Sequence, residues 1–180
     1  KTTLIDSVAG IIKPHKGNIK FDNNDISNFS EKSFKSNISY VDQNATLFNE
    51  SIIDNISWGL DKVSKNKIYE IAKQLDLHEK IKSLKNGYNT IAGDRGVNFS
   101  GGEVQRIIII RALIRNPKIL IACQPTRGLD EGAIASVQKL LLSSRSKGNA
   151  VLLITEDLDE LLSISDYISV IYRGRITQPI

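Results

Sequence analysis

Residues 98 to 106 read Asn98-Phe99-Ser100-Gly101-Gly102-Glu103-Val104-Gln105-Arg106, and the apolar run Ile107–Ile110 follows directly. The apolar run alone would favour a strand, but two glycines precede it and arginines recur around it at helical spacing, at positions 106, 111 and 115. We therefore predict a helix that begins at the glycines. A serine hydroxyl and two residues without side chains at a helix N-terminus form a compact site for an anion. A Gly-Gly turn that caps an ordinary helix is the alternative interpretation.

Around this stretch the chain alternates between predicted strands and helices. Four short β-branched runs bounded by polar loops predict buried strands: Ile38–Val41, Ile119–Cys123, Ala150–Thr155 and Tyr167–Tyr172. Apolar residues three to four apart predict helices around residues 68–77 and 134–141. Strands separated by helices pair in parallel, so we expect an α/β fold with a mainly parallel sheet.

The segment from about residue 47 to residue 114 interrupts this alternation, because it holds helical patterns and little strand signal. We predict an inserted α-helical subdomain there, with the α/β core formed by about residues 1–46 and 115–180. A length of 180 residues favours a single domain.

Composition limits the function less than the motifs do. The net charge of +4 is mixed along the chain and would fit nucleic acid, an anionic surface or nucleotide phosphates equally well. No apolar run approaches the roughly 20 residues of a membrane helix, so a membrane role would need a partner. The chain starts at Lys1 without a signal sequence, and we expect it to begin inside a larger polypeptide. His15 and His78, the two histidines, are expected at the surface.

The first residues have the pattern of a phosphate-binding loop as it enters its helix. Lys1, Thr2 and Thr3 are followed by apolar residues at helical spacing. In such a loop the lysine reaches the terminal phosphates and the next hydroxyl binds Mg²⁺. A Lys-Thr-Thr sequence is a weak signal alone, and its weight comes from the motifs that follow.

Two of the predicted strands end in polar residues, where ligands collect in α/β sheets. Gln43 follows the strand Ile38–Val41, and the strand Ile119–Cys123 runs into Gln124. The segment Gly128-Leu129-Asp130 comes next, and Glu156 stands at the end of the following strand. A lone glutamine after a strand is usually a solvated loop residue, but its place between Lys1 and the Ser-Gly-Gly stretch favours a functional interpretation.

The order of these motifs resembles the nucleotide-binding domain of ATP-binding-cassette (ABC) transporters over essentially the whole chain. The resemblance implies a RecA-like P-loop NTPase core with an inserted helical subdomain, and ATP and Mg²⁺ as ligands. The residues implied in nucleotide binding are Lys1, Thr2, Thr3, Gln43, Ser100, Gly101, Gly102, Glu103 and Asp130. Thr2, Gln43 and Cys123 stand at the positions implied for metal binding, and Ser100–Glu103 resembles the signature sequence that closes over the γ-phosphate held by a second cassette.

The catalytic positions implied by the resemblance depart from the family pattern. Cys123 replaces the aspartate that supports Mg²⁺, Gln124 replaces the catalytic glutamate, and Glu156 replaces the switch histidine. A neutral thiol is a poor partner for a hard cation, and an amide cannot accept a proton from water. We therefore predict weak or no hydrolysis at this chain's own site.

The resemblance also divides into two branches. Residues 1–118 look like an exporter-type domain, whereas residues 119–180 are similar to the degenerate second cassette of simple-sugar and nucleoside importers. The direction of transport stays open on this basis.

The leading prediction is a domain at the cytoplasmic face of a membrane that pairs with a second cassette, contacts a transmembrane domain through the loop after Gln43, and binds no nucleic acid. Two alternatives remain: a soluble ABC-type ATPase without a transport role, and a structural or regulatory module that has lost ATP. Co-purification with membranes would distinguish the transporter domain from the soluble ATPase. Binding of labelled ATP would distinguish it from the module that has lost ATP.

Overall fold

The computed structural model describes residues 2–180, and its centre is a three-stranded parallel sheet in the order β3-β4-β5. The strands span Ile38–Val41, Ile119–Cys123 and Ala150–Ile154. Ile38 pairs with Ile119, and Ile119 pairs with Ala150, so neighbouring strands start level with one another. The carboxyl ends of all three strands therefore meet at one edge, which confirms the predicted parallel α/β arrangement.

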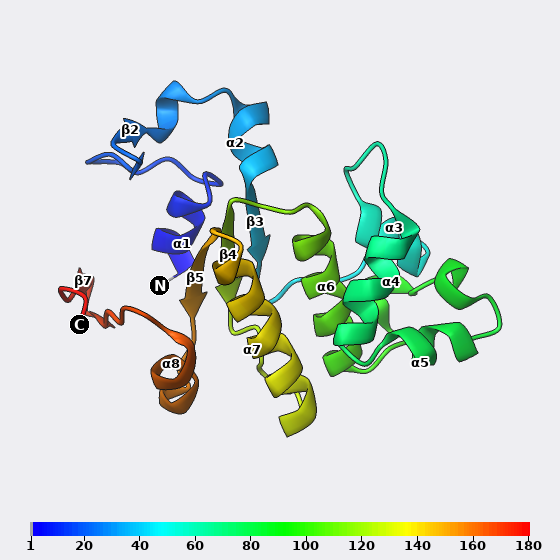
Figure 1. The fold of residues 1–180 in the computed structure, drawn as a ribbon. Helices are drawn as coiled ribbons and strands as arrows, with labels where there is room; N and C mark the ends of the chain where they lie inside the picture. The colour runs from blue at the N-terminus through cyan, green and yellow to red at the C-terminus, as the bar shows by residue number, and fades with distance from the viewer. Residues whose placement is uncertain (1) are drawn as a thin grey trace.

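The residues of β4 alternate between two apolar layers. Ile121 and Cys123 pack in a small cluster with Ile5 of α1 (Thr2–Val8), while Leu120 and Ala122 join the main core. Figure 1 shows the resulting layers, with α1 on one face of the sheet and α6 and α7 on the other. The period-two alternation of a strand explains how five consecutive apolar residues serve both layers.

The remaining helices begin and end as follows: α2 Glu31–Asn37, α3 Ile52–Ser57, α4 Lys65–Gln74, α5 His78–Ser83, α6 Gly101–Ile114, α7 Glu131–Ser146 and α8 Leu158–Ile164. Three 3₁₀ turns cover Ile26–Asn28, Gly87–Asn89 and Asp94–Gly96. The short strands β1 (Lys20–Phe21) and β2 (Asn24–Asp25) form one antiparallel pair, and β6 (Ile171–Tyr172) and β7 (Arg175–Ile176) form another. Side-chain caps from Ser or Asp start most of the longer helices.

The helices α3 to α6 lie together beside the sheet (Figure 1). Helix α6 contacts α3 and α4 on one side and β3 on the other. The apolar run Ile107–Ile110 is buried inside α6, so the helix predicted from the glycines and the arginine spacing is confirmed. The proposed boundaries of the helical subdomain, at about residues 47 and 114, stay a prediction.

Asn55 holds the loop before α3 in place. It is completely buried, and its side-chain amide donates to the carbonyls of Phe48, Glu50 and Ser51, while its Oδ1 accepts from the N–H of Phe48. Arg111 of α6 donates to the same Oδ1 at 2.7 Å and to the Asn55 carbonyl at 2.7 Å. One buried amide thus connects the loop, α3 and α6.

Asn55→Ala is expected to lower the free energy of unfolding by about 3 kcal/mol, because it removes the side-chain partner of several backbone groups of the loop and one of the hydrogen bonds of the Arg111 guanidinium. Denaturant unfolding measures the change. Asn49→Ala, at an exposed asparagine of the same loop, is the matched control and should change stability by less than about 0.5 kcal/mol. Equal effects of the two substitutions would contradict the role given to Asn55.

Two sequence predictions are wrong. The segment Tyr167–Tyr172 is not a buried strand: only Ile171–Tyr172 is a strand, it pairs with β7, and Tyr167 is 78% exposed. His78 is buried rather than at the surface, since its Nδ1 lies 3.0 Å from the hydroxyl of Tyr88 and its ring stacks against Tyr69. In both cases tertiary packing, which the local pattern does not contain, decided the outcome.

Candidate functional site

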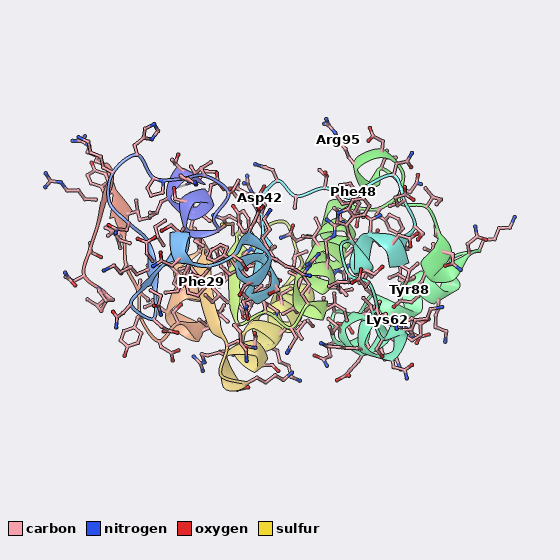
Figure 2. All side chains as sticks on the ribbon, turned by 90° about the horizontal axis from the view of Figure 1, so that it is seen from above. Phe29, Asp42, Phe48, Lys62, Tyr88 and Arg95 are labelled. Carbon is pink, nitrogen blue, oxygen red and sulfur yellow. The ribbon has the colours of Figure 1, made fainter. Side chains whose placement is uncertain are left out.

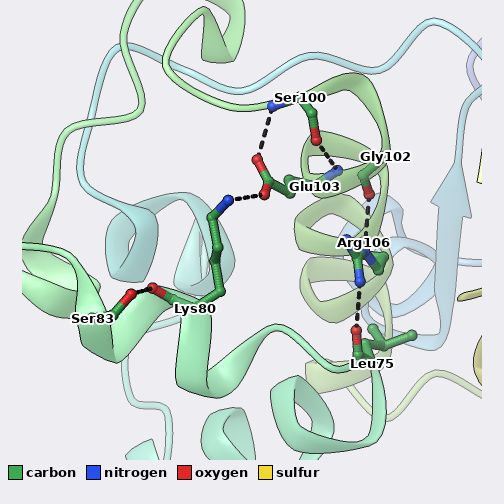
Figure 3. Close-up of polar contacts among 7 residues, drawn as sticks. All are labelled: Leu75, Lys80, Ser83, Ser100, Gly102, Glu103 and Arg106. Carbon is green, nitrogen blue, oxygen red and sulfur yellow. Dashed lines mark hydrogen bonds and ion pairs between the residues drawn. The ribbon is translucent and has the colours of Figure 1, made fainter.

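The N-terminus of α6 forms an exposed, capped tip. The Ser100 hydroxyl accepts a hydrogen bond from the N–H of Glu103 at 3.3 Å, and the Glu103 carboxylate accepts from the N–H of Ser100 at 2.8 Å. This reciprocal capping box, drawn in Figure 3, starts the helix at Gly101. Ser100 and Gly101 are exposed, so the predicted anion site faces outward and is not packed against the chain's own sheet.

A shallow depression of about 630 Å³ extends from this tip. Its lining comes from three separate segments: Gln43 and Ala45 after β3, residues 100–102 and 104–106 of the α6 tip, and residues 127–130 before α7. The lining includes two arginines, Arg106 and Arg127, together with Ser100 and one acidic residue, Asp130. Cations, a hydroxyl and a helix N-terminus together favour an anionic ligand.

Gly101 has no internal reason to be glycine. A Cβ built on it would meet nothing within 4 Å, whereas one on Gly102 would lie 3.2 Å from Leu129. Gly101 is also one of the residues that line the depression. This is the geometry expected where a group from outside the chain approaches the backbone closely.

Asp130 lines the same depression and caps α7. Its carboxylate accepts from the N–H of Ala133 at 2.9 Å, and that backbone hydrogen bond is the main cause that lowers the pKa of the carboxyl. The structure therefore brings together Gln43, Ser100, Gly101, Gly102 and Asp130, five of the residues singled out from the sequence.

Glu103 takes a different position from these residues. Its side chain is only 12% exposed, and both carboxylate oxygens are occupied within the chain, by Ser100 and by Lys80. It does not line the depression. Sequence reasoning grouped Glu103 with the nucleotide contacts, while its observed contacts are those of a helix cap.

The other predicted residues gather on the opposite layer, around α1 and the end of β4. Thr2 and Thr3 are exposed in the first turn of α1, which packs through Ile5 against Ile121 and Cys123. Lys1 lies outside the described residues. The hydroxyl and backbone groups at the start of α1 and the end of β4 are thus on one face of the sheet.

Cys123 is 5% exposed and lies in an environment that keeps its thiol neutral. Burial raises the pKa of the thiol most; a hydrogen bond with Tyr40 lowers it by less, and the negative charges of Asp42 and Asp6 add smaller increases, so the net change is upward. A protonated sulfur does not suit Mg²⁺, which prefers oxygen ligands. The residue at this position therefore does not fit the metal that the sequence resemblance implies.

Gln124 and Glu156 follow the ends of β4 and β5. Gln124 has a left-handed backbone (φ 50°), and its N–H donates to the Ile154 carbonyl at 2.8 Å. Strained backbone of this kind is held in place by the surrounding structure and clusters at functional positions. Glu156 is exposed at the neighbouring strand end. The adjacent strand ends thus carry an amide and a carboxylate.

An aromatic pair that sequence reasoning did not single out covers α3 and α6. The rings of Phe48 and Trp58 are 4.3 Å apart, and the side chains are 41% and 50% exposed. Arg111 lies over the Phe48 ring at 5.1 Å, and Arg115 donates to the Trp58 carbonyl. In Figure 2 the segment that follows β3 leads from Asp42 to Phe48. The two residues are ten positions apart, and no local pattern relates them.

The three-stranded parallel sheet, with polar side chains after its strand ends and an exposed, capped helix tip, has the architecture of an α/β nucleotide-binding domain with a RecA-like P-loop core. The family profile described as ABC transporter matches residues 1–127, and the chain belongs to this family.

Named relatives agree with this assignment. Multidrug resistance protein 4 of Entamoeba histolytica is 38% identical over 99% of this chain, and the ABC transporter ATP-binding protein YfiB of Bacillus subtilis is 36% identical over 92% of it. A solved structure of a bacterial Atm1-family ABC exporter with ATP bound matches with a TM-score of 0.89 and 31% identity over 99% of the chain. The chain is thus an ATP-binding domain of the ABC transporter family.

The chain spans 14%, 30% and 31% of the lengths of these three proteins. Within residues 2–180, no helix has both the length and the apolar character to cross a bilayer. The same residues contain no group of three or more His, Cys, Asp or Glu side chains that could hold a metal ion.

Proposed function

We propose that this domain works as one half of a pair of cassettes, and that the tip of α6 completes the ATP site of the opposing cassette. The observation that supports this most directly is the outward-facing tip, where Gly101 leaves open space next to the cationic depression. A triphosphate seated on the partner would meet the Ser100 hydroxyl and the free N–H groups of the first helical turn.

The domain's own site is proposed to bind nucleotide with little hydrolysis. Thr2 and Thr3 would face the phosphates, while Cys123 and Gln124 supply neither a carboxylate for a metal nor a base for water. Glu156, a carboxylate, would repel a γ-phosphate where a neutral donor would bind it. ATP turnover in the assembled pair then depends on the partner's active site, completed by this chain.

We also propose that the aromatic pair Phe48–Trp58 contacts a transmembrane domain, which would place this domain at the cytoplasmic face of a membrane. An exposed, stacked aromatic pair fixed by arginines from α6 is a typical anchor for a protein partner. Arg111 belongs to α6, lies over the Phe48 ring and donates to the Asn55 carbonyl of α3, so a single side chain connects the proposed membrane contact with the helix whose tip is proposed to bind the nucleotide.

A cross-linking experiment tests the proposed pairing. Gly101→Cys in the full transporter, combined with a cysteine in the phosphate loop of the partner cassette, should form a disulfide when ATP is added, because such a bond needs Cα atoms within about 7 Å. Cys123, the one cysteine of this sequence, is buried and will not compete, and any cysteine elsewhere in the transporter is replaced by serine beforehand. Lys62→Cys, at an exposed position outside the depression, is the control and should not cross-link. Absence of any ATP-dependent bond at Gly101→Cys would contradict the proposal.

A further inference from the structure

The α6 tip carries a negative charge, the Glu103 carboxylate, next to a residue at which the proposed function requires an anion to bind. The Glu103 carboxylate lies within hydrogen-bond distance of the Ser100 backbone, and Ser100 itself lines the depression. An unpaired carboxylate in this position would repel the phosphates of a nucleotide. A neighbouring group must therefore hold or neutralise it.

Lys80 of α5 supplies that group. Its Nζ lies 2.6 Å from Glu103 Oε1, while Oε2 remains bound to the N–H of Ser100, as Figure 3 shows. The two oxygens thus have separate partners on separate segments. Lys80 is 56% exposed and Glu103 only 12%, so the lysine covers the solvent side of the carboxylate.

A second cationic side chain, that of Arg106, binds backbone carbonyls in the same turn of α6 and in a neighbouring segment. Arg106 donates to the Gly102 carbonyl at 3.2 Å and to the carbonyl of Leu75, the residue directly after α4, at 3.1 Å (Figure 3). Arg106 therefore fixes the backbone of the turn without touching the carboxylate. Of these two cations, Lys80 is the one that compensates the charge of Glu103.

The causes that shift the pKa of Glu103 support the role of Lys80 as the cation that compensates its charge. Burial alone raises the pKa of the carboxyl, but the hydrogen bond from Lys80 and those from Ser100 outweigh it and hold the pKa below its usual value. The ionised state thus depends on these partners. Without Lys80 the carboxylate would lose its largest compensating contact and would either turn out of the cap or remain as an uncompensated charge beside the depression.

We infer that Lys80 is a positioning residue for the anion site of α6: it holds the Glu103 carboxylate in the helix cap and cancels its charge, so that the nucleotide phosphates of the partner cassette can approach Ser100 and Gly101. This inference rests on the proposed function. In this inference Lys80 neutralises the charge of Glu103, although the two residues are 23 positions apart in the sequence.

The test uses the full transporter in lipid, with the KM for ATP and the kcat of hydrolysis as readouts. Lys80→Gln is expected to raise KM about 3- to 10-fold, in the range of a charge-assisted hydrogen bond on a partly exposed pair. Glu103→Gln keeps an acceptor for the Ser100 N–H without the charge, so it should stay within about twofold of the unaltered protein. The double variant should match Glu103→Gln, because the charge that needs Lys80 is gone.

Lys82→Gln is the matched control, since it removes the same charge from the same helix but pairs with Glu79 rather than Glu103. It should leave KM within about twofold. Rising salt should narrow the difference in KM between Lys80→Gln and the unaltered protein, because salt screens the repulsion between the Glu103 carboxylate and the phosphates, although less than it would for two fully exposed charges. Thermal unfolding of each variant is measured alongside; a fall in Tm with no change in KM overturns the inference.

Persistence of the Lys80→Gln effect in the Glu103→Gln background also overturns it, since Lys80 would then act on the phosphates directly. If no ATP-dependent disulfide forms with Gly101→Cys, both the proposed function and this inference are contradicted. If the disulfide forms but Lys80→Gln and Lys82→Gln have the same KM for ATP, only this inference is contradicted.

Discussion

In the assembled transporter, Ser100→Arg is expected to lower ATP hydrolysis by about 100-fold or more. The substitution fills the depression with a long side chain at the point where the partner's triphosphate is proposed to bind, and it removes the hydroxyl that faces the phosphates. Loss of one preorganised donor to a transition-state charge typically costs about 10²- to 10³-fold in rate. Hydrolysis by the purified transporter at saturating ATP measures the effect.

Two further variants separate this effect from simple unfolding of the helix start. Ser100→Ala loses the same cap to the Glu103 N–H, at a cost of about 1 kcal/mol in stability, but leaves the depression open. Gln124→Ala alters the chain's own site and should hardly change turnover of the pair. Strong loss with Gln124→Ala and little loss with Ser100→Arg would refute the division of labour proposed for the two sites.

The sequence predicted the sheet well because local patterns determine it. Each strand of the parallel sheet is a short β-branched run with a helix between it and the next, and such a chain has few ways to bury both faces. The run Ile107–Ile110 shows a competition of signals: its composition favours a strand, but the cap at Ser100 and the arginine spacing favour a helix, and the structure has the helix.

The site was predictable in part for the same reason. Gln43, Ser100 and Asp130 lie at a strand end or a helix start, and those places are fixed by local sequence. The ion pair between Lys80 and Glu103 and the stack of Phe48 on Trp58 are not, because each depends on how α3, α5 and α6 pack. The same holds for His78, whose burial follows from contacts with Tyr69 and Tyr88.

The chain's own site is expected to contribute almost nothing to hydrolysis. When the general base of the partner cassette is removed by substitution, turnover of the pair should fall by about 10²- to 10⁴-fold, the contribution of a positioned base, because Gln124 cannot take over that role. If Gln124 sufficed for catalysis, at least half of the turnover would remain. Single-turnover hydrolysis by that transporter distinguishes these outcomes.

Gln124→Glu in the same base-deficient pair should raise the residual turnover about tenfold or more, since it introduces a proton acceptor at the end of β4. The two side chains have nearly the same shape, and the contact that fixes residue 124 is made by its backbone N–H with Ile154, so the left-handed conformation is retained. Gln124→Ala, which supplies no acceptor, should leave the residual turnover unchanged. An equal rise with Gln124→Ala would show that the amide obstructs the site, and an absence of any rise with Gln124→Glu would place the limitation at Cys123 or Glu156 instead of the missing base.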